Sequence, residues 1–381
     1  MLDSLKFSRE LNLLFLSIFL FATAIGIDLV TFPTVLTLNH VDPAHIGLAS
    51  TCEIIGGIFA SFFLSRFVGK LGMMRALGFS AFGYSAAILL IYFYQGFWLW
   101  ILFAIFMGCC WFIYVIVRQS WLNILLTDEQ RGIATGIFSM IVSAGLAIGP
   151  VIVNFTGASS YLSFIISAIL VLSSYNCILL LRKSPQPKIE SKRIALKDFF
   201  KKNPNCFMAR FFLDFQTYIL LIFTVVFGVH LGFSYEAAGL LITAYMASGF
   251  FDIWVGFLLK KVSPYNLINI GFLACIYSFI IILLYAKSYL LLVALYFVFG
   301  MSIACIYVSV FKIANEDYEK EKLVAANATF QLIGSIGSLC GTLTGGILIN
   351  IFGSQGFPIA IILSCVFYLT FLVINEKKYS K

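Results

Sequence analysis

Charged side chains are scarce in this chain. Aspartate, glutamate, lysine and arginine together make up 11% of the 381 residues, whereas hydrophobic residues make up 61%. Because a typical soluble domain carries about 25% charged residues, the composition argues against a soluble enzyme or a nucleic-acid-binding domain. The net charge of +8 comes from lysines and arginines in short loops, where such residues orient a membrane protein and contact anionic lipid.

The sequence also lacks the short motifs of common enzymes. It contains no GxxxxGK[ST] phosphate-binding loop, no HExxH and no GxSxG, which excludes the chemistry that these motifs support. Its nine cysteines form no CxxC pair. His40, Asp42 and His45 share one loop, and we interpret them as polar loop residues rather than metal ligands. We therefore expect no enzymatic activity, no cofactor, no metal site and no nucleic-acid partner.

Long polar segments are missing as well, with one exception away from the chain ends. Residues 182–205 read RKSPQPKIESKRIALKDFFKKNPN, and this stretch has eight basic residues against Glu190 and Asp198. No apolar run in it is long enough to cross a bilayer. We predict a basic cytoplasmic linker at 182–205 between two membrane-embedded domains, residues 1–181 and 206–381.

Hydrophobic runs of about 20 residues fill the rest of the chain, and each is long enough to cross the hydrocarbon core as a helix. Membrane strands would instead show alternating runs of about ten residues. The sequence therefore predicts an all-α membrane protein with twelve transmembrane helices, at Leu11–Leu36, Ile46–Phe67, Met74–Tyr94, Phe97–Ser120, Ile133–Asn154, Tyr161–Leu181, Phe207–Leu231, Ala237–Leu259, Leu267–Tyr285, Tyr289–Phe311, Ala326–Ile349 and Phe357–Ile374.

Loop charges predict the orientation of these helices. With both termini in the cytoplasm, the inner segments hold nearly all the loop lysines and arginines, and the outer loops hold Lys287 alone. Such a bias marks the cytoplasmic side. We therefore expect a multi-pass protein of the bacterial inner or plasma membrane, with the lipid bilayer as its main partner and a monomer as its oligomeric state.

The two halves of the chain resemble each other. A shift of 192 residues brings five glycines onto glycines: Gly47 onto Gly239, Gly57 onto Gly249, Gly108 onto Gly300, Gly145 onto Gly337 and Gly149 onto Gly341. At an average glycine content of about 7%, about one coincidence would be expected. The pattern predicts two copies of one six-helix bundle, related by an axis along the membrane normal.

The fifth predicted helix carries the most distinctive motif. Gly136, Gly145, Gly149 and Pro150 follow the spacing G-x8-G-x3-G-P. Glycines four residues apart let a neighbouring helix approach closely, and a proline removes a backbone donor and bends the helix.

With this motif, the twelve spans and the basic linker, the whole chain resembles the major facilitator superfamily. The fifth helix is similar to the signature of proton-coupled antiporters in that superfamily, although Val153 and Asn154 stand where the signature has its last two glycines. The resemblance implies antiport. The alternative is that these glycines only pack helices.

The loop between the second and third predicted helices is similar to the inner-gate motif of the same superfamily. Arg66, Gly69, Lys70, Gly72 and Arg75 supply its turn and positive charge. Ser65 stands near the place of the usual aspartate. The alternative interpretation is that these charges only set the topology.

Ionisable residues inside apolar segments are candidate functional residues because burying them in a membrane is costly. Asp28 and Glu53 are the candidate proton carriers, since a carboxylate in a low-dielectric cavity can exchange protons near neutral pH. The alternative for Asp28 is a fixed polar lock to a neighbouring helix.

The resemblance further implies that the first, fourth, seventh and tenth helices line a central cavity. It places these residues near a transport path: Trp111, Tyr114, Arg118, Arg210, Asp214, Tyr218, Tyr307 and Lys312. For Arg210 and Asp214, four residues apart on one helix face, a structural ion pair is the alternative. For Arg118 and Lys312 the alternative is that they reach the membrane interface.

The sequence therefore predicts a secondary active transporter of a small solute that works by alternating access. Proton-coupled efflux is our first hypothesis, with protons as the candidate coupling ion. Proton-linked or facilitated uptake of a metabolite is the alternative on the same fold, and a sensor or scaffold that does not transport is the alternative from another class.

Overall fold

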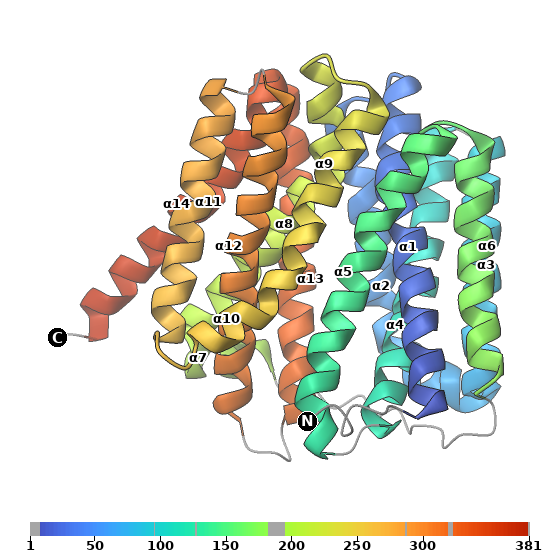
Figure 1. The fold of residues 1–381 in the computed structure, drawn as a ribbon, viewed down its shortest axis with the longest axis horizontal. Coiled ribbons are helices and arrows are strands. Elements are labelled where there is room, and N and C mark those ends of the chain that lie inside the picture. The colour runs from blue at the N-terminus through green and yellow to red at the C-terminus, as the bar shows by residue number, and fades with distance from the viewer. Residues whose placement is uncertain are drawn as a thin grey trace. The chain divides into compact units, whose positions relative to one another are not determined.

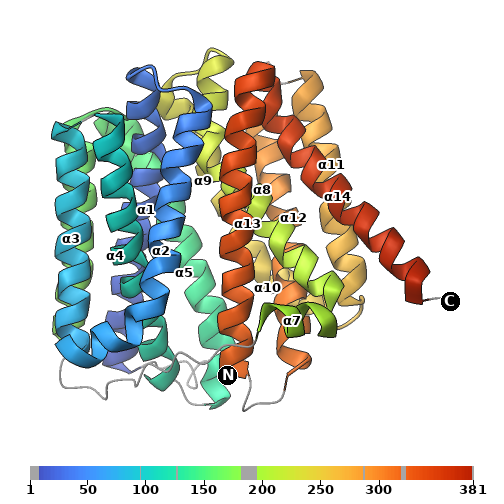
Figure 2. The same ribbon diagram turned by 180° about the vertical axis from the view of Figure 1, so that it is seen from behind.

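A computed structural model of the chain describes residues 8–94, 96–125, 128–181, 195–285, 288–318 and 323–379. In these ranges the regular structure is helical (Figures 1 and 2). Eleven helical stretches are long and apolar enough to cross a membrane, and the last of them, Ala328–Asn375, contains two helices joined by a short 3-10 turn. The expected all-α membrane fold is confirmed.

The first six helices lie before the predicted linker. They are α1 (Arg9–Leu38), α2 (Pro43–Leu71), α3 (Met73–Phe93), α4 (Phe97–Leu125), α5 (Asp128–Thr156) and α6 (Tyr161–Leu179). Prolines inside α1 and α5, at Pro33 and Pro150, do not end either helix. Gly72 has a φ of 79° and forms the tight turn between α2 and α3, a conformation that glycine adopts without strain.

The remaining elements are α7 (Leu196–Lys202), α8 (Pro204–His230), α9 (Tyr235–Ala247), the 3-10 helix η2 (Ser248–Phe251), α10 (Asp252–Leu258), α11 (Pro264–Tyr285), α12 (Tyr289–Glu316), α13 (Leu323–Phe352), η4 (Gly353–Gln355) and α14 (Gly356–Tyr379). The helix predicted at Ala237–Leu259 is thus interrupted at η2. There the Ser248 hydroxyl donates to the Tyr245 carbonyl oxygen at 2.6 Å, and such a local bond competes with regular helical bonding.

The end of the predicted linker is helical. Residues 182–194 lie outside the described part of the chain, but α7 occupies Leu196–Lys202 and α8 begins at Pro204. Asn203 joins them: its Oδ1 accepts from the Cys206 backbone N–H at 3.0 Å, and its Nδ2 donates to the Tyr265 hydroxyl and to Asp317 Oδ2, each at 3.0 Å. The Asn203 side chain therefore caps α8 and connects it by hydrogen bonds to the start of α11 and the end of α12.

The chain divides into two compact units. Unit 1 comprises residues 1–35 and 52–190, and unit 2 comprises residues 36–51 and 191–381. In unit 1, α3 packs against α4 and α6. In unit 2, α8 lies alongside α13, and α11 packs against α12 and α14 (Figures 1 and 2).

The first turns of α2 belong to unit 2 because they pack against α13. The Thr51 and Thr342 hydroxyls are 2.7 Å apart. Gly47 lies against the Thr342 carbonyl group, and a Cβ on Gly346 would lie 2.6 Å from the Pro43 carbonyl oxygen. Close backbone approach at small residues is typical of helix packing in membranes.

The internal repeat recurs in the contacts of each unit. In unit 1, Gly145 of α5 packs against the Phe19 carbonyl oxygen of α1, and in unit 2, Gly337 of α13 packs against that of Phe211 of α8. Both members of the second pair follow the first by 192 residues. The same shift relates the contact of Gly108 with the Glu53 carbonyl oxygen to that of Gly300 with the Tyr245 carbonyl oxygen. The predicted pair of pseudo-symmetric bundles is confirmed.

Candidate functional site

Asp28 lies in the interior of unit 1, where 4% of its surface is exposed. Its Oδ2 accepts a hydrogen bond from the Tyr84 hydroxyl of α3 at 3.0 Å, and its Oδ1 accepts one from the Ser167 hydroxyl of α6 at 2.7 Å. The carboxyl group thus joins three helices, and its side chain points into the bundle. Because both partners are neutral donors, they hold the group in place without fixing its charge.

Glu53 of α2 is the second candidate proton carrier. It is partly exposed, and it lies within electrostatic range of Asp28. Gly108 of α4 packs directly against the Glu53 carbonyl oxygen, which brings α2 and α4 close together at this level. Among the described residues, neither Asp28 nor Glu53 forms an ion pair with a cation.

Arg118 of α4 is a buried cation of the same unit, with 4% of its surface exposed. Its NH1 donates to the Ser17 carbonyl oxygen at 3.0 Å and its Nε to the Tyr114 carbonyl oxygen at 3.3 Å. Its Cζ lies 4.5 Å from the centre of the Phe21 ring and 4.4 Å from that of the Tyr114 ring. Cation–π contacts and carbonyl acceptors therefore stabilise this charge, and no described carboxylate pairs with it.

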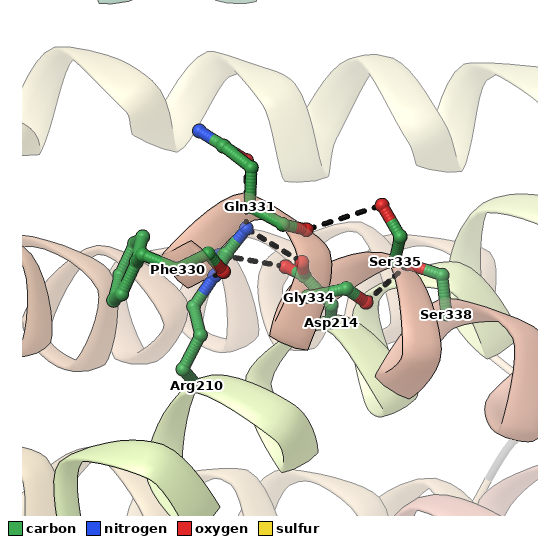
Figure 3. A network of polar contacts seen from close by, with 7 residues as sticks. All are labelled: Arg210, Asp214, Phe330, Gln331, Gly334, Ser335 and Ser338. Atoms are coloured by element: carbon green, nitrogen blue, oxygen red, sulfur yellow. Dashed lines mark hydrogen bonds and ion pairs between the residues drawn. The ribbon is translucent and has the colours of Figure 1, made fainter. Parts of the chain in front are cut away.

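Unit 2 also contains a buried arginine, but this one is paired. Arg210 NH1 donates to Asp214 Oδ1 at 2.9 Å, and its NH2 lies 2.7 Å from Asp214 Oδ2 (Figure 3). The guanidinium also donates to the Phe330 carbonyl oxygen at 3.3 Å and to Gln331 Oε1 at 3.2 Å. A bidentate pair with further acceptors is the geometry in which a buried ion pair is stable.

The ion pair lies on a glycine of α13. A Cβ built on Gly334 would overlap Asp214 Oδ2 and the Arg210 guanidinium. Figure 3 shows Gly334 directly beside the two charged side chains, one turn before Ser338. The absence of a side chain at this position therefore lets α8 bring its charged pair against α13.

The glycines of the predicted antiporter-like motif pack α5 against α1. A Cβ on Gly145 would lie 2.7 Å from the Ala22 Cβ, and Gly149 lies against the backbone of Gly26. Pro150 is buried within α5. The surroundings of Gly136 lie outside the described part of the structure. The described contacts of the motif are helix-packing contacts.

The other predicted cavity residues lie in varied surroundings. Trp111 and Tyr218 are partly buried. Tyr307 stacks on Phe311 with ring centres 6.1 Å apart, and the Arg210 Cζ lies 5.8 Å from the centre of its ring. Lys312 donates to the Leu259 carbonyl oxygen at 3.4 Å, and its Nζ is 3.8 Å from the exposed Glu316.

The inner-gate residues lie at the surface of unit 1. Arg66, Gly69, Lys70, Gly72 and Arg75 are all exposed. The side chain of Ser65 lies outside the described part of the structure.

Tyr84, Ser167, Gln331 and Gly334 belong to the site but carry no sequence signal of their own, because hydroxyls, amides and glycines are common in apolar helices. Among the described residues, no group of three or more His, Cys, Asp or Glu side chains could hold a metal ion.

A family model and two relatives indicate one family. The model of the Major Facilitator Superfamily matches residues 14–338 and 206–380. An uncharacterised MFS-type transporter of Bacillus subtilis (strain 168) is 23% identical over 364 residues, which cover 93% of this chain and 92% of the relative. Another, from Yersinia enterocolitica, is 24% identical over 377 residues, 96% of each chain.

Solved structures share the fold at lower identity. The nucleoside transporter NupG superposes with a TM-score of 0.79 at 15% identity, covering 98% of this chain and 100% of that protein. A POT family transporter in complex with 5-aminolevulinic acid superposes with a TM-score of 0.78 at 14% identity, covering 97% of this chain and 96% of that one. At such identities the likeness concerns the fold alone.

Proposed function

This chain is a membrane transporter that belongs to the major facilitator superfamily, and from that premise we propose that it expels a small solute from the cell in exchange for protons. The observation that carries the proton coupling is the pair of carboxyl groups inside unit 1. Asp28 is buried, Glu53 lies within electrostatic range of it, and neither is paired with a cation among the described residues.

Asp28 is suited to carry a proton because its partners tolerate both of its charge states. The Tyr84 and Ser167 hydroxyls donate to the ionised carboxylate, and a hydroxyl can also accept from the protonated form after rotating. The Arg210–Asp214 pair of unit 2 differs, since its bidentate contact with a cation favours only the ionised form of the carboxyl group. We therefore assign proton exchange to unit 1 and a fixed structural role to the Arg210–Asp214 pair.

Glu53 supplies a route to the buried group. It is partly exposed while Asp28 is not, which makes it the candidate first acceptor of a proton bound for Asp28. Two neighbouring carboxylates repel each other when both are ionised, which favours one proton shared by the pair. Each proton that crosses the membrane potential supplies about 2.3 kcal/mol per 100 mV for solute export.

The outward direction rests on the fifth-helix motif, whose glycines bring α5 against α1, the helix that carries Asp28. A change in the charge of Asp28 would thus act on a helix that is in close contact with α5. Uptake by the same fold remains the alternative, and the direction of accumulation in cells separates the two.

The test has two stages. A strain lacking the protein is first screened for changed drug resistance and metabolite retention, which identifies a solute. Purified protein in liposomes with an imposed pH gradient is then assayed with that solute. We expect the rate of solute flux to depend on the pH gradient in the wild type and to be independent of it in Asp28→Asn.

The matched control is Asp198→Asn, which changes an exposed carboxylate of α7 and should leave the coupling intact. Flux that ignores the gradient in the wild type, or coupling that survives in Asp28→Asn, would refute the proposed role of this residue.

A further inference from the structure

One face of α1 is polar at two levels and apolar between them. Ser17, Phe21, Ala24 and Asp28 follow one another at helical spacing, and each has at most 4% of its surface exposed. Residues separated by three, four, seven and eleven positions share a helix face. Ser17 and Asp28 therefore lie on one line along α1, with the Phe21 ring between them.

The facing side of α6 has the same division. Ser167 donates to Asp28, and Ser174 lies 2.9 Å from the Ser17 hydroxyl. Between these two serines, Val171 is completely buried. The interface of α1 and α6 thus contains two polar levels separated by one apolar level, which is formed by Phe21 and Val171.

The level at Ser17 is a connected network. The Tyr114 hydroxyl lies 2.8 Å from that of Ser174, which in turn donates to the Ser17 carbonyl oxygen at 2.7 Å. Arg118 donates to the same carbonyl oxygen. The level at Asp28 is connected as well, since Tyr84 and Ser167 both donate to the carboxyl group.

The Phe21 ring contacts both levels. Its centre lies 5.9 Å from that of the Tyr84 ring, whose hydroxyl bonds Asp28, and 4.7 Å from that of the Tyr114 ring, whose hydroxyl bonds Ser174. The Arg118 Cζ lies 4.5 Å from the same ring centre. One aromatic side chain therefore stands between the buried carboxyl group and the buried guanidinium group.

We propose that the polar interface of α1 and α6 is a proton path inside unit 1, and that the apolar level of Phe21 and Val171 is the barrier that closes it, so that a change at either residue opens it. The proposal rests on the proposed function, because it says which second polar level the proton held by Asp28 can reach. A hydroxyl that receives a proton on one side releases its own on the other, so a row of hydroxyls passes protons without net chemical change. The phenyl ring has no donor or acceptor and interrupts the row.

Arg118 strengthens the barrier. Apolar constrictions keep water out of membrane pores, and a fixed arginine charge repels protons in such pores. The Phe21 ring supplies the first effect and the guanidinium that stacks on it supplies the second. Among the described residues, the titratable and charged groups near the path are Tyr84 from α3, Glu53 from α2, Cys110, Tyr114 and Arg118 from α4, and Cys177 from α6. A closed barrier is what a coupled transporter needs, because an open path would dissipate the proton gradient without moving solute.

The experiment needs no solute. Purified protein is placed in phosphatidylethanolamine–phosphatidylglycerol liposomes that contain a pH-sensitive dye, and a potassium gradient with valinomycin drives protons inward. We expect wild-type liposomes to acidify no faster than liposomes without protein. Phe21→Ala should acidify several-fold faster, and the double variant Phe21→Ala with Asp28→Asn should return to the wild-type rate.

Two further variants guard against misfolding. Phe32→Ala makes the same truncation on α1, at a ring that packs against Trp100 and Phe164. Liposomes with this variant should acidify at the wild-type rate. Val171→Thr adds a hydroxyl at the apolar level with little change in volume. This variant should conduct protons even if Phe21→Ala does not fold. If neither Val171→Thr nor a folded Phe21→Ala leaks, or if the leak persists in the double variant, the path does not exist.

The outcome is separable from that of the proposed function. Solute flux that follows the pH gradient, together with a tight Phe21→Ala variant, refutes only the path. A leak that depends on Asp28, together with solute flux that ignores the gradient, refutes only the exchange and leaves the path standing.

Discussion

Gly334 of α13 lies so close to Asp214 of α8 that a methyl group in place of its hydrogen would overlap the Asp214 Oδ2. We expect Gly334→Ala to force the Arg210–Asp214 pair apart. The free energy of unfolding should fall by about 1–3 kcal/mol, the usual cost of overpacking. Chemical denaturation of the purified protein in detergent would measure the change.

The control for this variant is Gly256→Ala in α10. A Cβ there meets nothing within 4 Å, so the substitution should be neutral or stabilise the helix by about 0.5–1 kcal/mol. A Gly334→Ala protein as stable as Gly256→Ala would show that the ion pair has room to move.

A double-mutant cycle on Arg210 and Asp214 tests whether the pair acts as a unit. Removing either partner leaves an uncompensated charge, because the side chains are only 6% and 16% exposed; such losses cost about 3–5 kcal/mol. Arg210→Met with Asp214→Leu removes both charges and should cost much less than the two single changes together. Additive losses in the unfolding free energy would mean that the two charges are solvated separately.

The contacts of Asp42, which lies outside the membrane spans, should make the stability of the fold depend on pH. Partial burial acts to raise its pKa, but the hydrogen bonds from the His45 backbone N–H and ring, and from the Ala44 N–H, outweigh it and hold the pKa of Asp42 below the usual 3.8. A carboxylate with a lowered folded-state pKa stabilises the fold above its unfolded pKa, and this contribution is lost as the pH falls through the folded value.

The effect can be measured as the difference in melting temperature between wild type and Asp42→Ala. We expect this difference to shrink below about pH 4 as the carboxyl group becomes protonated. The size should be modest because 42% of the side chain is exposed and exposed interactions are screened by water. Asp42→Asn keeps a capping oxygen and should lose less stability than Asp42→Ala near neutral pH.

The sequence predicted the helices because crossing a bilayer imposes a length of apolar chain that can be read locally. It did not predict α7, and it did not predict the break at η2. Both depend on contacts with distant residues. Phe199 of α7 is buried and stacks on Tyr318 with ring centres 5.5 Å apart, and η2 meets Gly300 through Ser248. A single sequence does not contain such pairings.

Some residues of the candidate site could likewise be predicted from the sequence, and others could not. Asp28 was found because a charge in an apolar run is unusual, and Arg210 and Asp214 were grouped because four residues make one helical turn. Tyr84 and Ser167 were missed because they lie 56 and 139 residues from Asp28 along the chain. Their relation to Asp28 depends on the rotation of α3 and α6, which apolar composition does not fix.

Gly26 and Gly149 meet where α1 crosses α5. Because a Cβ on Gly149 would overlap the Gly26 backbone, and a Cβ on Gly26 would lie 2.6 Å from the Leu146 carbonyl oxygen, either alanine substitution should push the helices apart. We expect each to lower the unfolding free energy by about 1–3 kcal/mol. The double variant should lose less than the sum, since the first methyl group already makes room for the second.

This pair also separates the two interpretations of the fifth-helix motif. If the glycines serve only to pack helices, variants that fold should exchange protons for solute at the wild-type ratio. If they also serve antiport, Gly149→Ala should lower that ratio in proteoliposomes even in protein that remains folded. Gly345→Ala is the comparison, because the three atoms nearest to its Cβ would be side-chain atoms of α8, at 3.0 Å or more. Loss of coupling in Gly149→Ala but not in Gly345→Ala would tie the α1–α5 contact to the movement of the proton on Asp28.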